Sequence, residues 1–304
     1  MQIPVKDIEI KHDVDELLRE LKASGGFMAK ELGEAVDILE EMIKQKDCLK
    51  FLSFPACIIA TGCRGIIREL VRRKLFDVII TTCGTLDHDL ARSFKEYFHG
   101  SFFTDDSELR RKGICRLGNV FIPNESYGII IEEKMREFIK GLTVDKELST
   151  YELCWKLGEF IGNEDSILYW CFRNRIPMII PGLTDGAVGY HIWEFGKKLR
   201  IDQFKDEDLL SELVWKAKLS GALVIGGGIS KHHVIWWNQF KGGLDYVVYL
   251  STAVEWDGSL SGAHSREGIS WGKVKEGAKQ AVVYGDATIN LPILVASLFK
   301  RIKI

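Results

Sequence analysis

Two amphipathic segments open the chain, and both predict helices. The first carries apolar residues at helical spacing, namely Val14, Leu17, Leu18 and Leu21. A Ser-Gly-Gly break at residues 24–26 separates it from a second periodic run over residues 28–43. We therefore expect residues 1–50 to form a helical N-terminal extension.

Beyond this extension, short apolar runs alternate with amphipathic segments. The apolar runs are mostly continuous, which is typical of parallel strands buried on both faces; they cover residues 56–60, 78–82, 177–180, 222–225, 246–250 and 281–284. Helical periodicity covers residues 65–74, 88–97, 134–141, 152–161, 206–219 and 291–301. This order predicts an α/β fold with a doubly wound, mostly parallel, Rossmann-like sheet. No linker or repeat divides residues 51–304, so we expect one domain behind the extension.

Composition excludes several classes of function. The 304 residues are 46% hydrophobic and 28% charged, with a formal net charge of −2, and no lysine/arginine stripe indicates nucleic-acid binding. No apolar run reaches the ~18 residues of a membrane span. Seven scattered cysteines without a CxxC pair indicate reduced thiols rather than disulfides or a metal site. Together with an N-terminus that lacks an apolar signal segment, these features predict a cytoplasmic protein.

Small residues and glycines follow five of the predicted strands. In an open α/β sheet, ligands bind beyond the carboxyl ends of the strands, and free amides at helix starts suit a pyrophosphate. Neither G-x-G-x-x-G nor GxxxxGK[ST] occurs, so a nucleotide or dinucleotide site would be of another type, and each glycine alone is also compatible with a simple turn. These strand ends are Thr81-Thr82-Cys83-Gly84-Thr85, Pro181-Gly182-Leu183-Thr184-Asp185-Gly186, Gly226-Gly227-Gly228, Ser251-Thr252-Ala253 and Gly285-Asp286-Ala287-Thr288.

One lysine, Lys273, stands in an unusual setting directly after Trp271 and Gly272. The indole could shield its ammonium from water, and desolvation favours the neutral, nucleophilic amine. Glu267, six residues earlier, could hold a cationic substrate. The alternative interpretation is a solvated lysine beside a core tryptophan.

Seven ordered segments resemble the deoxyhypusine synthase family, from about residue 51 nearly to the C-terminus. They are Thr81-Thr82 with Asp87-His88-Asp89, Arg116-Leu117-Gly118-Asn119 with Ile122-Pro123-Asn124-Glu125, Leu183-Thr184-Asp185-Gly186, Gly226-Gly227-Gly228-Ile229-Ser230-Lys231-His232-His233, Asp257-Gly258-Ser259-Leu260-Ser261-Gly262, Glu267-Gly268-Ile269-Ser270-Trp271-Gly272-Lys273 and Tyr284-Gly285-Asp286-Ala287-Thr288.

The resemblance implies a transferase that uses NAD as a transient hydride acceptor. In this family spermidine loses a hydride to NAD, its aminobutyl unit forms an imine (a Schiff base) with an enzyme lysine, and the unit then passes to one lysine of the hypusine-containing translation factor precursor. Residues 51–304 would then be an NAD-binding catalytic domain. Family members are homotetramers with active sites built across a dimer interface, and we expect the same assembly here.

The resemblance also implies roles for individual residues. Lys273 would form the imine, and His232 would lie beside the spermidine carbon that loses the hydride. Trp271 would wall the aliphatic part of the polyamine, and Glu267 would pair with one of its ammonium groups. Further substrate-side positions are Gly258, Ser261 and Tyr190. The NAD-side positions are Thr82, Cys83, Gly84, Asp185, Gly226, Gly227, Thr252, Ala253, Asp257 and Asp286.

Two positions in the polyamine pocket depart from the eukaryotic pattern, because Tyr190 and Leu260 stand where that pattern has acidic residues. Glu255 could supply a replacement charge. Otherwise the donor could be another polyamine, such as an agmatine derivative, or the acceptor a small amine, as in the related homospermidine synthases. A non-catalytic NAD-binding paralogue is a further alternative.

Overall fold

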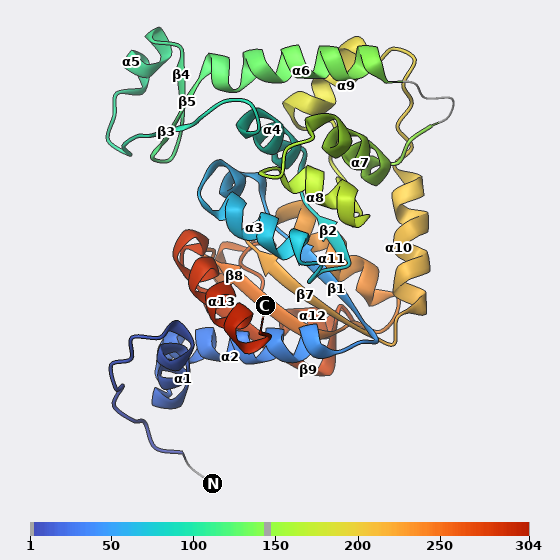
Figure 1. Ribbon diagram of the computed structural model, residues 1–304. Helices are drawn as coiled ribbons and strands as arrows, with labels where there is room; N and C mark the ends of the chain where they lie inside the picture. The colour runs from blue at the N-terminus through green and yellow to red at the C-terminus, as the bar shows by residue number, and fades with distance from the viewer. Residues whose placement is uncertain (1–2, 143–146, 304) are drawn as a thin grey trace. The chain divides into compact units, whose positions relative to one another are not determined.

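The structure is a computed structural model that describes residues 3–142 and 147–303. Its chain forms two compact units (Figure 1). Unit 1 comprises Met1–Phe54, Leu75–Val78 and Leu210–Ile304, and unit 2 comprises Pro55–Lys74 and Ile79–Leu209. The organisation expected from the sequence, a helical extension over residues 1–50 and one α/β domain over residues 51–304, stays a prediction.

The main sheet has six strands in the order β6-β2-β1-β7-β8-β9. They are β1 (Cys48–Ser53), β2 (Val78–Ile80), β6 (Met178–Ile179), β7 (Leu219–Ile225), β8 (Leu244–Ser251) and β9 (Val274–Tyr284). The pairs β2–β6, β1–β7, β7–β8 and β8–β9 are parallel. Most of the strand residues are buried, as continuous apolar strands covered on both faces require. The predicted α/β fold with a parallel, doubly wound sheet is confirmed.

In unit 1, helices cover both faces of the sheet. Tyr246 of β8 donates a hydrogen bond to Glu41 of α2 (Phe27–Lys44), whereas the ring of Tyr249 lies 4.3 Å from the ammonium of Lys231 on α11 (Gly228–Gln239). Because successive strand side chains alternate, residues 246 and 249 point to opposite faces. In the pairing of β8 with β9, Leu244 lies opposite Val274 and Ser251 opposite Tyr284, with an irregularity after Leu244.

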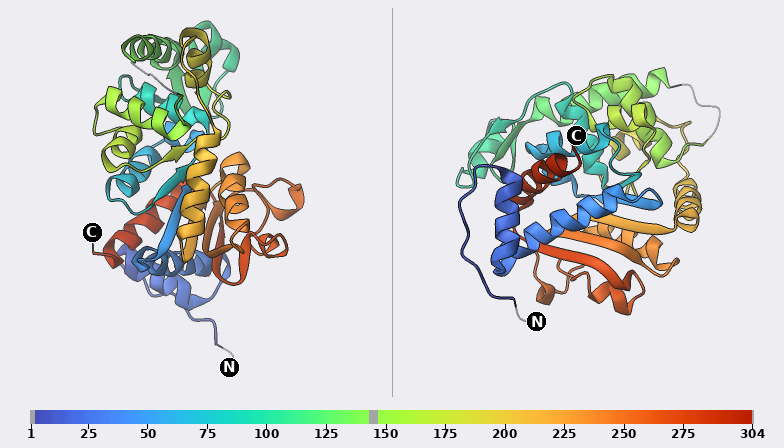
Figure 2. Two further views of the ribbon diagram at one scale, coloured as in Figure 1. Left: turned by 90° about the vertical axis from the view of Figure 1, so that its right-hand side faces the viewer. Right: turned by 60° about the horizontal axis from the view of Figure 1, so that its bottom comes forward.

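The predicted N-terminal helices pack with the C-terminal helix. They are α1 (Val14–Ser24) and α2, and they contact each other and α13 (Ala287–Arg301), as Figure 2 shows. Arg301 of α13, whose side chain is 2% exposed, pairs with Asp15 of α1 and with Asp37 of α2. This buried ion cluster ties the first helices of the chain to the last. The remaining regular elements of unit 1 are η3 (Glu255–Asp257) and α12 (Glu267–Ser270).

Unit 2 surrounds the short strands β2 and β6 with helices. Buried Asp89 joins three of them, because it pairs with Arg64 of α3 at 2.7 Å and accepts hydrogen bonds from the amides of Ile167 and Leu168 at the start of α8. The helices are α3 (Cys63–Arg72), α4 (Cys83–Arg92), α6 (Gly128–Gly141), α7 (Thr150–Ile161), α8 (Ile167–Asn174) and α9 (Ala187–Phe195), while α10 (Phe204–Lys216) crosses the boundary between the units.

The sequence missed a small antiparallel sheet in unit 2. Its strands are only two to four residues long and have the order β3-β5-β4, namely β3 (Phe98–His99), β4 (Ile114–Leu117) and β5 (Val120–Pro123). A short helix, α5 (Asp106–Arg111), and the 3₁₀ turn η2 (Asn124–Ser126) flank it. Such short strands carry too few residues to show an alternating pattern.

The first predicted strand is wrong. Residues 56–60 form a 3₁₀ helix, η1 (Ala56–Ala60), and the strand lies just upstream as β1. Both segments are mainly apolar, so hydrophobicity alone cannot tell one from the other. Pro55 separates them and precedes η1 in an extended conformation. In the part of the chain that the structure describes, no helix has the length and apolar character that a membrane crossing requires.

Candidate active site

The carboxyl ends of β7, β8 and β9 meet at one edge of the sheet in unit 1. These strands are parallel neighbours, and the backbone hydrogen bonds between them continue just past the strand ends. Gly226 N donates to Leu250 O at 2.7 Å, and Gly285 N donates to Ser251 O at 2.9 Å. The structure therefore brings together three of the expected NAD-side segments: Gly226-Gly227, Thr252-Ala253 and Asp286.

A glycine turn joins β7 to α11 at this edge. Gly226 and Gly228 both have φ near +68°, a left-handed conformation that favours glycine. A Cβ at Gly228 would meet nothing within 4 Å, so the backbone here faces open space. α11 begins without a side-chain cap, which leaves its first amides available to a negatively charged group. This turn fits a pyrophosphate-bearing ligand such as NAD.

Asp286 acts locally as the N-cap of α13. One of its carboxylate oxygens accepts from Thr288 N at 2.8 Å and the other from Thr288 Oγ1 at 2.9 Å. Its side chain is exposed, so the remaining lone pairs face solvent. Capping and ligand binding are compatible at this position.

Unit 2 holds four of the expected NAD-side residues, Thr82, Cys83, Gly84 and Asp185, at the carboxyl ends of β2 and β6. Thr82 precedes α4, which begins at Cys83, and Asp185 precedes the start of α9. A Cβ at Gly186 would lie 2.6 Å from Cys83 Sγ, so the two helix starts pack in direct contact. Likewise, a Cβ at Gly84 would lie 2.8 Å from the Cβ of Ala56 in η1.

A buried carboxylate fixes this arrangement. Asp87 accepts hydrogen bonds from the amides of Ala187 and Val188, at 2.9 and 2.8 Å, and from the hydroxyl of Tyr127 at 2.9 Å. Burial raises the pKa of Asp87, while these three donors oppose the shift. Burial also raises the pKa of the Cys83 thiol, so Cys83 contributes packing and backbone rather than a thiolate.

Lys273 lies between α12 and β9 in unit 1. It follows Gly272, whose φ of 67° is left-handed, and its ammonium lies 5.2 Å from the centre of the Trp271 ring. Trp271 is 61% exposed, so the tryptophan is a surface residue beside the lysine and not part of the core. The pair can receive a ligand that has both a cationic and an apolar part.

His232 shares the electrostatic environment of Lys273. Partial burial lowers the pKa of His232, and the positive charge of Lys273 lowers it further. His232 therefore carries a neutral imidazole at neutral pH, able to accept a proton. Its ring stacks on Trp236 one turn along α11, with ring centres 6.4 Å apart. Burial, and then the charge of His232, lower the pKa of the adjacent His233 to about 4.

The substrate-side loop packs against the glycine turn. A Cβ at Gly227 would lie 2.3 Å from Ser261 Cα, so residue 227 must be small for the loop to approach. Gly258, with φ of 72°, and Asp257, which accepts from Ser259 N at 2.6 Å, shape the start of the loop. Thus Ser261, Gly258 and Asp257 lie on one loop beside Gly227.

Two charged residues of this region have positions that sequence alone did not predict. Glu255 pairs with Arg266 at 2.9 Å, so it is not a free replacement for the acid missing at Leu260. Glu267 is exposed, and its charge acts on buried Lys231, whose pKa burial lowers to about 8 against the effect of Glu267. Tyr190 is 51% exposed on α9 and belongs to unit 2, whereas Lys273 belongs to unit 1.

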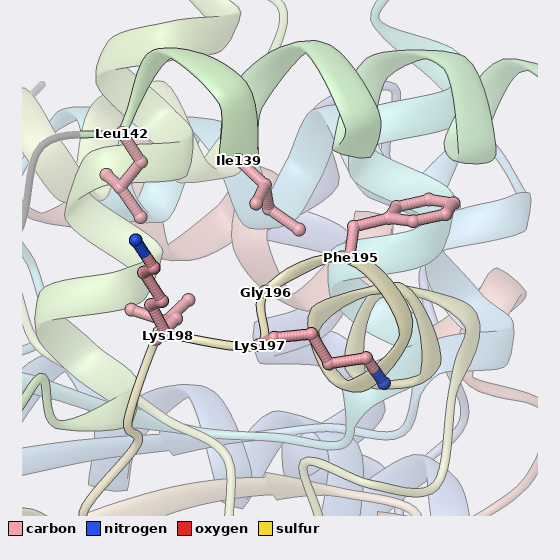
Figure 3. Close-up of a pocket in the computed structure, with 7 residues that line it drawn as sticks. Ile139, Leu142, Phe195, Gly196, Lys197 and Lys198 are labelled. Carbon is pink, nitrogen blue, oxygen red and sulfur yellow. The ribbon is translucent and has the colours of Figure 1, made fainter.

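A separate surface pocket of about 360 Å³ lies between α6 and the end of α9 (Figure 3). Figure 3 shows Ile139 beside Phe195, with Lys198 reaching towards Leu142. The full lining is Ile139, Leu142, Phe195, Gly196, Lys197, Lys198 and Leu199. The residues singled out from the sequence do not line this pocket.

Comparison with known proteins decides the family. The family model described as DS: Deoxyhypusine synthase matches residues 16–298. This chain belongs to the deoxyhypusine synthase family. Two relatives named probable deoxyhypusine synthases, from Picrophilus torridus and Thermoplasma acidophilum, are 54% and 50% identical to it. The alignments cover 98% and 96% of this chain and 97% and 96% of those proteins.

A crystal structure from Entamoeba histolytica, assigned provisionally as a deoxyhypusine synthase, has the same fold. It superposes with a TM-score of 0.65 over 98% of this chain and 97% of that chain, at 20% identity. The family resemblance inferred from the seven segments is thus confirmed. Lys231 and Asp87 stand inside those segments, yet their buried hydrogen bonds could be recognised only from the structure.

Proposed function

We propose that this member of the deoxyhypusine synthase family transfers the aminobutyl group of spermidine to a specific lysine of the hypusine-containing translation factor precursor. The observation that carries the proposal is that Lys273 lies close enough to His232 for its charge to lower the pKa of that histidine. One residue supplies an amine beside an exposed indole, and the other a neutral imidazole in the same electrostatic environment. These are the nucleophile and the proton acceptor that the transfer requires.

In the first step, the secondary amine of spermidine is oxidised to an imine. NAD, held at the glycine turn of Gly226–Gly228, would supply the hydride acceptor for this oxidation, and His232 would take the proton from the nitrogen. The amine of Lys273 then adds to the imine carbon and the diaminopropane portion leaves, so that the aminobutyl unit is held as an imine on Lys273. The acceptor lysine would displace Lys273 in the same way and free its amine. The bound nicotinamide would supply the hydride for the final reduction to the secondary amine, and protonated His232 would return the proton.

The residues at the strand ends fit NAD on structural grounds. The open left-handed turn at Gly226–Gly228 and the uncapped start of α11 suit the pyrophosphate. The exposed carboxylates of Asp286 and Asp185 can accept hydrogen bonds from ribose hydroxyls. We assign the same side of the site to Thr82, Cys83, Gly84, Thr252, Ala253 and Asp257.

On the substrate side, Glu267 is the carboxylate that we assign to an ammonium group of the donor. Ser261 and Gly258 would shape the loop beside it, and Tyr190 would line the polyamine pocket. The pairing of Glu255 with Arg266 supports a second candidate donor, a polyamine with fewer positive charges, because it leaves the position of Leu260 without a substitute acid. The homotetramer and the cytoplasmic location expected from the sequence remain part of the proposal.

A trapping experiment tests the function. The full-length protein is incubated with NAD and spermidine, reduced with borohydride and mapped by mass spectrometry. An aminobutyl adduct on Lys273 is the expected result, and K273R, which keeps the charge but cannot form the imine, should give none. An unmodified Lys273 in the wild type would overturn the proposal.

The choice of substrates is read in parallel incubations. Adding the translation factor precursor should give that protein the aminobutyl mass increase, whereas transfer only to added small amines would contradict the assigned acceptor. Replacing spermidine with agmatine tests the second candidate donor. If the donor carries fewer positive charges than spermidine, the adduct on Lys273 should form faster with agmatine.

A further inference from the structure

We infer that Lys231 is a positioning residue that fixes residues 259–263 of the substrate-side loop against the start of α11, where His232 lies. The inference deepens the proposed function and rests on it for the catalytic consequence. Its structural part concerns the loop alone and can be tested without any substrate.

Lys231 is almost completely withdrawn from water. It is 1% exposed, and its ammonium donates to Leu260 O at 2.8 Å and to Ala263 O at 2.7 Å. The ammonium also lies 4.3 Å from the centre of the Tyr249 ring, within the range of a cation–π contact. Two carbonyls and one ring therefore hold the three donors of this side chain in place.

The carbonyls of Leu260 and Ala263 lie on either side of the two residues that pack against the glycine turn and β8. Between Leu260 and Ala263 lie Ser261, which packs on Gly227, and Gly262, where a Cβ would lie 2.0 Å from Val254 O. Ser251 Oγ also donates to Ser261 O at 3.1 Å. The loop is thus held from β8, from the glycine turn and from α11, and Lys231 supplies the α11 contact.

The chemistry of the contact explains why a lysine is present. Backbone carbonyls buried without donors are costly, so removing the ammonium would leave two acceptors unpaired and would favour a loop that moves out to water. Such a movement would carry Ser261 away from Gly227 and change the wall of the site next to His232. Because Lys231 makes no contact with the reacting atoms in this assignment, it acts through the loop.

The expected consequences separate positioning from catalysis. Replacing Lys231 by Met keeps an unbranched side chain that is one heavy atom shorter and removes both hydrogen bonds. We expect the amides of Gly262 and Ala263, which donate to Ser259 O, to exchange with solvent at least roughly tenfold faster in K231M. For the reaction, we expect KM for the donor to rise roughly tenfold or more, with kcat within about threefold of the wild type.

Lys241 offers a matched control. It lies just beyond the other end of α11 and donates to Ala217 O, also a backbone carbonyl. K241M should leave both the exchange of the loop and KM unchanged. If K231M does not fold, K231Q, which keeps one donor, is compared with K241Q by the same two measurements.

Hydrogen exchange of the loop is measured on the substrate-free protein. Unchanged exchange at Gly262 and Ala263 in the Lys231 variant would overturn the inference, as would a large loss of kcat with KM unchanged. An unmodified Lys273 in the wild type would instead overturn the proposed function. The hydrogen-exchange result would still decide whether Lys231 fixes the loop.

Discussion

His232 shows how one side chain acquires a chemical role from its surroundings. Partial burial and the nearby charge of Lys273 lower its pKa, so protonation is disfavoured by the same lysine that would form the imine. The charge of Lys273 thus disfavours a proton on His232. The two groups are therefore coupled, and a change at one should be visible in the titration of the other.

At the scale of this residue, we predict that H232Q lowers kcat for adduct formation about 100- to 10,000-fold, because glutamine cannot accept the proton. In a second variant, K273M, the pKa of His232 should rise, because the neighbouring positive charge is gone. The His232 ring resonance, followed by NMR against pH, measures this shift. A His232 pKa that stays the same in K273M would show that the two residues are not coupled.

A second residue-scale prediction concerns His88. Burial lowers its pKa to about 4, below the ordinary value of 6.5, and its Nδ1 lies 2.9 Å from the hydroxyl of Tyr97. The unfolded chain therefore binds a proton at higher pH than the folded protein does. This contribution to stability is fully present above about pH 6.5 and is lost as the pH falls towards 4, by roughly 3 kcal/mol.

Urea unfolding between pH 7 and pH 4 measures this loss. H88Q should show a shallower decline of the unfolding free energy than the wild type. H99Q, which changes an exposed histidine, should decline in parallel with the wild type. Identical slopes for H88Q and the wild type would contradict the prediction.

At the scale of elements, the ion cluster of α1, α2 and α13 should determine how firmly the N-terminal helices are held. Burial would raise the pKa of Asp15, but hydrogen bonds from Arg301, Ser297 and Arg19 outweigh it and lower that pKa. We expect R301M to cost about 3–5 kcal/mol of unfolding free energy, because it leaves buried Asp15 without its main partner.

The same cluster predicts the direction of a pH effect. Because the pKa of Asp15 is lowered in the folded protein, its ionised carboxylate stabilises the fold at pH values above the ordinary pKa of aspartate. This contribution to the free energy of unfolding is lost as the pH falls through the lowered pKa. Urea unfolding of R301M measures the cost. K11M, which removes an exposed ion pair with Glu9, should change stability by less than about 1 kcal/mol. Equal effects of the two substitutions would contradict the prediction.

A further prediction at this scale concerns the contact between the starts of α4 and α9. The φ of Gly186 is extended, so glycine is required there for space: an added Cβ would meet Cys83 Sγ at 2.6 Å and Asp87 Oδ2 at 3.0 Å. G186A should weaken NAD binding about tenfold or more, as isothermal titration would measure. G128A is the control, since a Cβ at the start of α6 would meet nothing within 4 Å. If G186A and G128A bind NAD equally well, the contact between the starts of α4 and α9 does not have the assigned role.

At the scale of the whole molecule, several large aromatic side chains of unit 1 stand in solvent: Trp236, Phe240, Trp256 and Trp271. Exposed aromatics of this number are typical of surfaces that become buried on association. We predict a homotetramer in solution, measured by size-exclusion chromatography with light scattering. A monomer at micromolar concentration would contradict it.

The sequence predicted the order of strands and helices well, because parallel strands buried on both faces leave continuous apolar runs. It misjudged the segment from Cys48 to Ala60, where a strand and a 3₁₀ helix of similar hydrophobicity adjoin. The role of Lys231 could not be predicted either. Its partners Leu260 and Ala263 lie about thirty positions away, and a bond to a backbone carbonyl leaves no mark on the identity of the partner residue.

The length of the β8–β9 pairing determines which bound molecules can protect Lys273 and Asp286 at the same time. From the pair Leu244–Val274 to the pair Ser251–Tyr284 the sheet extends over the eight residues of β8, which are seven steps or roughly 23 Å. Lys273 precedes one end of this span and Asp286 follows the other. A compact molecule bound at Asp286 would thus leave Lys273 open to reagents, and only an extended one could protect both ends at once.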